Sequence, residues 1–257
     1  MTKKPLILIT NDDGYNAPGI LHLTKLMKTL GEVVVVASEQ SQSAMGHAIT
    51  MKVPLVFKQT PNTNGYKEFI TNGTPADCIK LGLHKILDRK PDLVVSGINH
   101  GSNASINIIY SGTMAAALEA AMGGIPSIGF SLLDYAHDAD FSGADDYILK
   151  LSKHIINNGL PSGVSLNVNF PKLNSEAYKG YKICRQSKAY WKEDFSERLD
   201  PRTQKPYYWL TGTFHILEDH RDTDEWALAN YYVSVVPVQF DFTAYHAIEN
   251  LNNIDIN

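Results

Sequence analysis

Short runs of apolar, largely β-branched residues alternate with helical patterns through the first 171 residues of the chain. Residues 7–10 and 33–36 read as fully buried strands, and residues 19–30 between them carry apolar side chains at helical spacing. Further strand patterns follow at 91–97, 125–131 and 164–170, with a helix pattern at 145–156. Strand, helix, strand is the opening of a doubly wound sheet, so we expect an α/β fold with a mostly parallel sheet.

Two adjacent acids, Asp12 and Asp13, come directly after the first strand pattern. Open parallel sheets place ligands at the carboxyl ends of their strands. Adjacent carboxylates raise the pKa of one another unless a cation lies between them, and oxygen ligands of this kind suit Mg²⁺, Mn²⁺ or Ca²⁺. The alternative is an Asx-type turn with solvated acids, because Asn, Asp and Gly are common turn residues. The motif alone leaves both interpretations open.

Other polar segments should reach the same edge of the sheet. Residues 38–47 follow the strand pattern at 33–36, and residues 98–103 follow the one at 91–97. Both segments are rich in small polar side chains. Ser111-Gly112-Thr113 precedes a run of good helix formers at 114–122 and therefore opens a helix. Its backbone N–H groups, two hydroxyls and the helix dipole together suit a phosphate. The alternative is a plain Ser or Thr N-cap.

Two local patterns lie between these loops. Residues 48–71, with a polar break at 62–65, predict a hairpin-like excursion from the regular alternation. Thr74, Pro75 and Asp77 predict a helix start, with the helix running to about residue 87.

The alternation of strand and helix patterns ends at Pro171. We expect a single domain of residues 1–257 that consists of an α/β core at 1–171 and a C-terminal extension at 172–257. Aromatic residues at alternating spacing predict a projecting hairpin at about 188–212, with a charged break from Glu193 to Pro206. An isolated hairpin is marginally stable in water, so its aromatic faces need a partner surface, either the body of the protein or another subunit, and we favour another subunit. Residues 219–224 form a charge-dense segment that is either solvated or rims the site, and residues 232–238 predict a last strand before a short helix.

Composition excludes several classes of protein. The formal net charge of -4 argues against an electrostatic grip on a nucleic-acid polymer. The two cysteines, Cys78 and Cys184, form no CxxC pair, which indicates neither a disulfide framework nor a zinc site. The apolar run near the amino terminus is too short for a signal peptide or a membrane span. We therefore expect a cytoplasmic protein that does not interact with a membrane.

Five motifs in order closely resemble the SurE family, the survival-protein 5′-nucleotidases. They are Thr10-Asn11-Asp12-Asp13-Gly14, Gln42-Ser43-Ala44-Met45-Gly46-His47, Asn72-Gly73-Thr74-Pro75-Ala76-Asp77-Cys78, Val95-Ser96-Gly97-Ile98-Asn99-His100-Gly101 and Tyr110-Ser111-Gly112-Thr113. The similarity continues through Arg185-Gln186-Ser187 and Trp191, so it covers nearly the whole chain. The resemblance implies a Rossmann-like core, a hairpin exchanged between the subunits of a homodimer or tetramer, and hydrolysis of nucleoside 5′-monophosphates by attack of a metal-activated water.

The resemblance also implies roles for individual residues. One divalent cation per subunit, Mg²⁺ or Mn²⁺, would be held by Asp12, Asp13, Ser43 and Asn99. Phosphate would be bound by Ser111, Gly112 and Thr113, with Asn11 nearby. Ala48 stands where the family often has a hydroxyl residue, which removes any hydrogen bond from that position.

The proton acceptor stays open at this point. Asp12 or Asp13 can accept the proton of the water or attack phosphorus to give an aspartyl-phosphate. His47 and His100 are further candidates for acid or base, although a histidine in a polar loop is more often structural.

Rival interpretations fit the sequence less well. A phospho-receiver module needs an acceptor Asp after its third strand, where this chain has Asn99, and is about half as long. A non-catalytic nucleotide-binding module would be favoured by Gly-x-Gly-x-x-Gly in the first turn, which this chain lacks. A haloacid-dehalogenase-type phosphatase places its second Asp two residues after the first, where this chain has Gly14.

Overall fold

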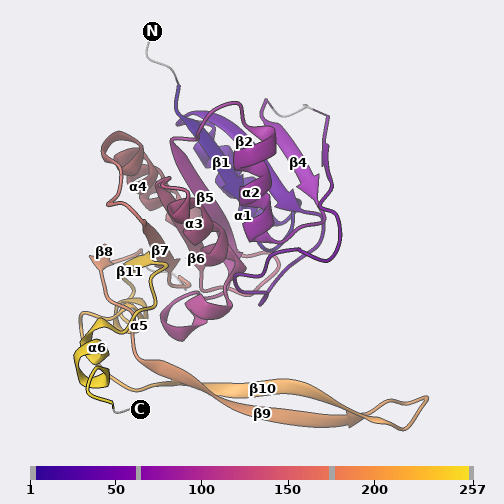
Figure 1. Ribbon diagram of the computed structural model, residues 1–257, viewed down its shortest axis with the longest axis vertical. Coiled ribbons are helices and arrows are strands. Elements are labelled where there is room, and N and C mark those ends of the chain that lie inside the picture. The colour runs from indigo at the N-terminus through magenta and orange to yellow at the C-terminus, as the bar shows by residue number, and fades with distance from the viewer. Residues whose placement is uncertain (1–3, 62–64, 174–176, 255–257) are drawn as a thin grey trace.

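A computed structural model describes residues 4–61, 65–173 and 177–254 of the chain. Its body is a nine-stranded sheet with the strand order β3-β4-β2-β1-β5-β6-β7-β11-β8 (Figure 1). These strands are β1 (Leu6–Thr10), β2 (Glu32–Ser38), β3 (Phe57–Gln59), β4 (Lys67–Thr71), β5 (Leu93–His100), β6 (Ser127–Leu132), β7 (Val164–Phe170), β8 (Tyr181–Ile183) and β11 (Val233–Gln239).

The six consecutive strands from β4 to β7 are parallel, and β1 lies between β2 and β5. Antiparallel pairing occurs toward the two edges, where β3 joins β4 and β11 joins β7. The expectation of an α/β fold with a mostly parallel sheet is therefore confirmed. The excursion expected at 48–71 contains the β3–β4 pair, while residues 62–64 of its expected break lie outside the described residues.

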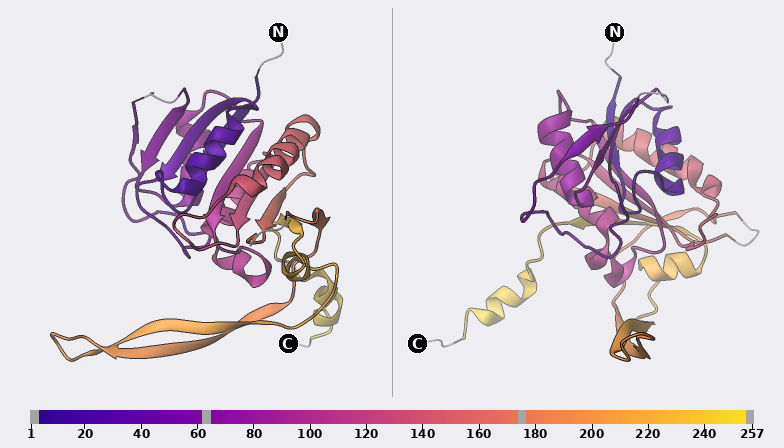
Figure 2. Two further views of the ribbon diagram at one scale, coloured as in Figure 1. Left: turned by 180° about the vertical axis from the view of Figure 1, so that it is seen from behind. Right: turned by 90° about the vertical axis from the view of Figure 1, so that its right-hand side faces the viewer.

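Helices cover both faces of the sheet, as the right-hand view of Figure 2 shows. On one face, α1 (Pro18–Met27) and α4 (Asp145–Asn158) share a hydrophobic cluster with Ile7 and Ile9 of β1. On the other, α2 (Pro75–Leu81) and α3 (Gly112–Met122) share a second cluster with Leu8. Successive side chains of a strand point to opposite faces, so helices on both faces bury β1 along its whole length. The polar residues of this segment follow at the carboxyl end of the strand.

Local sequence signals explain where the flanking helices begin. Thr74 and Asp77 form the capping box at the start of α2, as predicted, but the α-helix ends at Leu81 and continues as a π-helical turn, Gly82–Ile86. Gly19 allows α1 to approach β5 closely, because a Cβ at this position would lie 1.9 Å from the Ile98 carbonyl oxygen. No helix within the described residues is both long and apolar enough to cross a bilayer.

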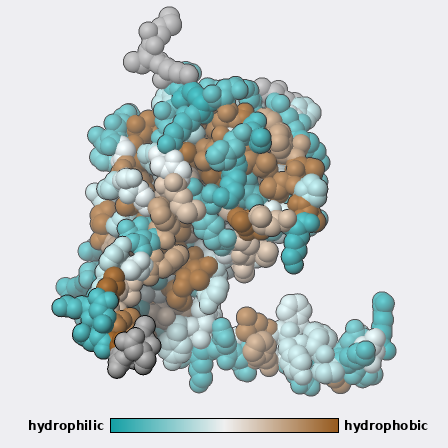
Figure 3. All heavy atoms as spheres, viewed as in Figure 1, coloured by the Kyte–Doolittle hydropathy of each residue, from teal (hydrophilic) through white to brown (hydrophobic). Residues whose placement is uncertain are grey.

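The C-terminal part adds β8 and β11 to the sheet and a separate hairpin of β9 (Ala189–Leu199) and β10 (Pro206–Ile216). The hairpin projects from the body, and open solvent separates most of its length from the core (Figure 1, Figure 3). The prediction that a break extends from Glu193 to Pro206 is wrong. Strand β9 continues to Leu199, and the turn covers only residues 200–205. A strand exposed on both faces accommodates charged side chains, so their presence in β9 does not interrupt it.

Two short helices complete the C-terminal part, α5 (Asp224–Ala229) and α6 (Tyr245–Leu251). The first begins at the end of the charge-dense segment 219–224, and Thr223 caps it by accepting the backbone N–H of Trp226.

Candidate active site

Asp12 is a buried and hydrogen-bonded acid at the end of β1. It is 4% exposed, and its Oδ1 accepts a hydrogen bond of 2.6 Å from the Thr113 hydroxyl of α3. Gly112 makes this approach possible, because a Cβ there would lie 2.8 Å from Cβ of Asp12. The helix that starts with Gly112 is thereby docked directly on the acidic turn.

Burial raises the pKa of both acids. It raises the pKa of Asp12 to about 6, against the lowering effect of the Thr113 hydrogen bond, and the charge of Asp13 adds to the increase. Burial also raises the pKa of Asp13, while the neighbouring His100 lowers it. Two adjacent carboxylates, one buried and one partly buried, with raised pKa values form a site that a cation would stabilise.

The loops after β2 and β5 converge on these acids. The Gln42 N–H donates to the Asp12 carbonyl oxygen at 2.7 Å, which brings the loop with Ser43 to the end of β1. The His100 backbone nitrogen lies 3.4 Å from Oδ2 of Asp13, which brings the segment that contains Asn99 to the same carboxylate. Ser43 is exposed and shares a hydrogen bond with Ser41. The structure thus brings the segments of all four predicted metal ligands to one edge of the sheet.

The donor set fits a hard cation better than a transition metal with nitrogen or sulfur ligands. The described residues contain no cluster of three or more His, Cys, Asp or Glu side chains that could hold a metal ion. The site offers carboxylate, amide and hydroxyl oxygens instead, which are the ligands of Mg²⁺ and Mn²⁺. Asn11 Oδ1 is also buried without a hydrogen-bond partner among the described residues, and a buried polar atom of this kind is costly unless a ligand or water binds it.

Ser111 and Thr113 use their hydroxyls differently at the start of α3. Ser111 is the N-cap and accepts the Met114 N–H at 3.0 Å, so its own hydroxyl hydrogen remains available to a ligand. Thr113 is fully buried and donates its hydroxyl hydrogen to Asp12. Any contact of Thr113 with a phosphate must therefore come from its backbone N–H, which is among the unpaired donors of a first helical turn.

The two candidate histidines lie in different surroundings. His47 Nε2 pairs with Glu119 of α3 at 2.9 Å, which ties the end of the Ser43 loop to the flank of this helix. His100 packs its ring edge-on against Phe141, with ring centroids 5.1 Å apart. Its Nδ1 is buried and has no hydrogen-bond partner among the described residues. The backbone N–H of His100 contacts the acidic pair, because it donates to Asp13.

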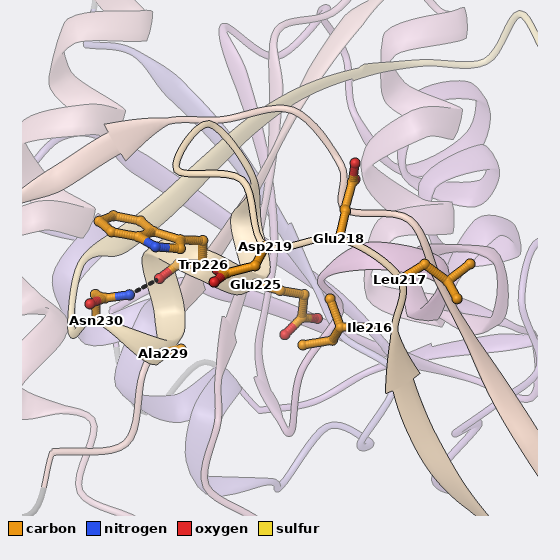
Figure 4. Close-up of a pocket in the computed structure, with 8 residues that line it drawn as sticks. All are labelled: Ile216, Leu217, Glu218, Asp219, Glu225, Trp226, Ala229 and Asn230. Atoms are coloured by element: carbon orange, nitrogen blue, oxygen red, sulfur yellow. Dashed lines mark hydrogen bonds between the residues drawn. The ribbon is translucent and has the colours of Figure 1, made fainter.

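Two hollows lie near these elements. One, of about 670 Å³, opens beside Ser111 and is lined largely by apolar side chains, among them Ile108, Ile109, Leu118 and Val238. The other, of about 660 Å³, lies at the root of the hairpin between the end of β10 and α5 (Figure 4). All of its lining residues come from 216–230, so only the first hollow is continuous with the candidate site.

One buried acid that joins several segments, Asp224, was not singled out from the sequence. Asp224 is 1% exposed, and its carboxylate accepts the backbone N–H groups of Ser105, Ser187 and Glu225. The Thr223-Asp224 pair that starts α5 was the available signal, because Thr followed by two acids is typical of a helix start.

The family model described as Survival protein SurE matches residues 7–193. The chain belongs to the SurE family. Among SurE relatives, it is 57% identical to the 5′-nucleotidase SurE of Flavobacterium psychrophilum, covering 99% of both chains. It is 56% identical to that of Christiangramia forsetii, covering 99% of this chain and 98% of the relative.

The crystal structure of the SurE protein from Aquifex aeolicus is similar to this chain throughout. The TM-score is 0.82 at 40% identity, covering 96% of this chain and 98% of the other. The resemblance inferred from the five motifs is thus confirmed, and with it the SurE-type α/β core with a C-terminal hairpin.

Proposed function

We propose that this chain is a divalent-metal-dependent 5′-nucleotidase that hydrolyses nucleoside 5′-monophosphates to nucleoside and phosphate. The observation that carries the proposal is the hydrogen bond from Thr113 to Asp12, which joins a helix N-terminus to the buried member of the acidic pair Asp12 and Asp13. An anion-binding helix end beside a cation-binding pair of carboxylates is suited to a terminal phosphate. The relatives named 5′-nucleotidase SurE support the same activity.

Each part of the site has a distinct task in this reaction. The N–H groups of Gly112 and Thr113, with the Ser111 hydroxyl and Asn11, bind the phosphoryl oxygens. The oxygen of a water attacks phosphorus, the bond from phosphorus to the 5′ oxygen breaks, and the nucleoside leaves as its alcohol. Asp13, the more exposed of the two acids, or Asp12 accepts one proton of the water, and this proton passes to the departing 5′ oxygen.

Asp12, Asp13, Ser43 and Asn99 are the residues that would hold the divalent cation. When bound, the cation supplies charge neutralisation for the phosphoryl oxygens and makes a water more acidic. Thr113 holds the Asp12 carboxylate in one orientation for that purpose.

Phosphate release from a panel of nucleoside 5′-monophosphates, with Mg²⁺ or Mn²⁺ and with or without chelator, tests the proposal. We expect activity that chelator abolishes, and loss of both Mn²⁺ binding and nearly all turnover in Asp12→Asn with the fold retained. Activity undiminished by chelator would contradict the proposal. A stable phosphoprotein without free phosphate would instead support a receiver-like module, and nucleotide binding without turnover a non-catalytic one.

We also infer a homodimer or tetramer assembled through the β9–β10 hairpin, in the cytoplasm. The hairpin is a two-stranded sheet of its own and exposes large side chains, namely Phe195, Tyr208, Trp209 and Leu210. A hairpin of this kind is marginal in water, and a second subunit is the surface best suited to cover it. Both cysteines, Cys78 and Cys184, are buried and free, as is usual in a reducing compartment.

A further inference from the structure

A single buried carboxylate joins the root of the hairpin to the segment that leads into the candidate site. Asp224 Oδ2 accepts the Ser105 N–H at 2.8 Å, and Oδ1 accepts the Ser187 N–H at 2.8 Å. Ser105 begins the 3-10 helix Ser105–Tyr110 (η2), and Ser187 lies two residues before β9. Asp224 therefore fixes two backbone segments that are distant in sequence.

Two further hydrogen bonds join the same segments. The Ser105 hydroxyl donates to the Ser187 carbonyl oxygen at 2.8 Å. Trp191 of β9 donates its indole N–H to Oδ1 of Asn107 at 2.8 Å. Ser105 has a φ of 53°, a backbone conformation that residues other than glycine adopt only when their surroundings hold them there.

The η2 helix in turn supports both halves of the site. Its last residue, Tyr110, precedes the N-cap Ser111, whose N–H donates to the Ile108 carbonyl oxygen at 3.3 Å. The Tyr110 carbonyl oxygen accepts the Gly46 N–H at 3.1 Å. Gly46 belongs to the loop that carries Ser43. A displacement of η2 would therefore move the phosphate-binding turn and the Ser43 loop.

We propose that Asp224 is a positioning residue for phosphate binding, acting through η2, and that the hairpin root is coupled to the site by this carboxylate. The proposal rests on the function proposed above. A carboxylate presents two acceptor oxygens, one for Ser105 and one for Ser187. An asparagine of the same shape presents one acceptor and one donor, so one of the two segments loses its hydrogen bond to residue 224, while the bonds from Ser105 to Ser187 and from Trp191 to Asn107 still join the segments.

The test compares Asp224→Asn with the parent and with Glu225→Gln, using the full chain. Glu225 is the adjacent acid of α5, and Figure 4 shows its side chain among the residues of the hollow that Ile216 and Trp226 line. Calorimetry measures the Kd of Mn²⁺ and, with Mn²⁺ present, the Kd of inorganic phosphate. Steady-state assays measure kcat and KM for a nucleoside monophosphate.

We expect Asp224→Asn to raise the phosphate Kd at least about fivefold and to change the Mn²⁺ Kd less than about twofold. The difference arises because three of the four residues that would hold the cation lie on elements whose hydrogen bonds among the described residues do not involve Asp224: Asp12 and Asp13 follow β1, and Asn99 lies in β5. The fourth, Ser43, belongs to a loop that η2 contacts, whereas the whole phosphate-binding turn follows η2 directly. Glu225→Gln should leave both constants unchanged. Trp191→Phe, which removes the bond to Asn107 and keeps an aromatic ring beside Phe214, should raise the phosphate Kd about twofold.

An unchanged phosphate Kd in folded Asp224→Asn would overturn the proposal, as would an equal loss of phosphate and Mn²⁺ affinity. If Asp224→Asn does not fold, Trp191→Phe decides by the same criterion. A parent protein that binds phosphate but does not hydrolyse nucleotides would refute the proposed function alone. The comparison of phosphate affinities between parent and variants would still be valid in that case.

Discussion

At the scale of single residues, the Thr113 hydroxyl has the most specific task in the site. Thr113→Val keeps the shape of the side chain and removes the 2.6 Å hydrogen bond to Asp12. A hydrogen bond to a charged group contributes about 1.5–3 kcal/mol, so we expect kcat to fall roughly tenfold to a hundredfold. Because Thr113 acts on Asp12 rather than on the leaving group, the decrease should be the same for every nucleotide and for simple aryl phosphates.

Thr24→Val is the matched control for this prediction. Thr24 is a buried threonine of α1, and its hydroxyl has no hydrogen-bond partner in the part of the chain that the structure describes. This variant makes the same chemical change away from the site and should retain parental kcat. A Thr113→Val enzyme with parental kcat on all substrates would show that the Asp12 contact is dispensable.

At the scale of elements, the short helix α5 makes stability depend on pH. Burial raises the pKa of Glu225 to about 7, and the neighbouring Asp224 adds to this increase. The unfolded chain ionises this acid near its ordinary pKa of 4.5, while the folded chain keeps the proton until about pH 7. The free energy of unfolding should therefore fall between about pH 4.5 and 7, by up to about 3 kcal/mol.

Glu225→Gln should remove the contribution of this acid to the pH dependence of stability. We expect the variant to gain stability relative to the parent as pH rises from 5 to 8, measured by denaturant unfolding at each pH. Glu249→Gln, a change of an exposed acid on α6, is the control and should follow the parent. Parallel curves for the parent and Glu225→Gln would mean that Glu225 ionises normally in the folded protein.

At the scale of the whole molecule, the hairpin should determine association. Asp194 and Thr211 are paired across β9 and β10, so replacing residues 195–210 with Asn-Gly closes a shorter hairpin in the same register. This variant loses Phe195, Tyr208, Trp209 and Leu210, and we expect native mass measurements at micromolar concentration to show weaker association.

A tip variant separates this effect from simple shortening. Replacing only residues 201–204 with Asn-Gly keeps both strands and should leave association unchanged. A parent that is monomeric at micromolar concentration would contradict the assignment of the hairpin as an interface.

Much of the fold could be predicted from the sequence because its signals are local. The buried strand β1, the acids after it, the Thr74 cap and the Ser111 cap each depend on a few consecutive residues. The boundaries that were wrong lie where the local signal is weak. Charged residues in β9 concealed a strand that is exposed on both faces, and α5 has only six residues, too few for helical periodicity to be recognised.

By itself, the sequence predicted which segments reach the carboxyl edge of the sheet, because parallel strands that end in polar residues bring those residues to one edge. Only the tertiary structure decided how they are connected there. Thr113 meets Asp12 across 101 residues, and Asp224 meets Ser105 across 119. No periodicity or short motif encodes such contacts, because they arise from the docking of whole helices and loops against the completed sheet.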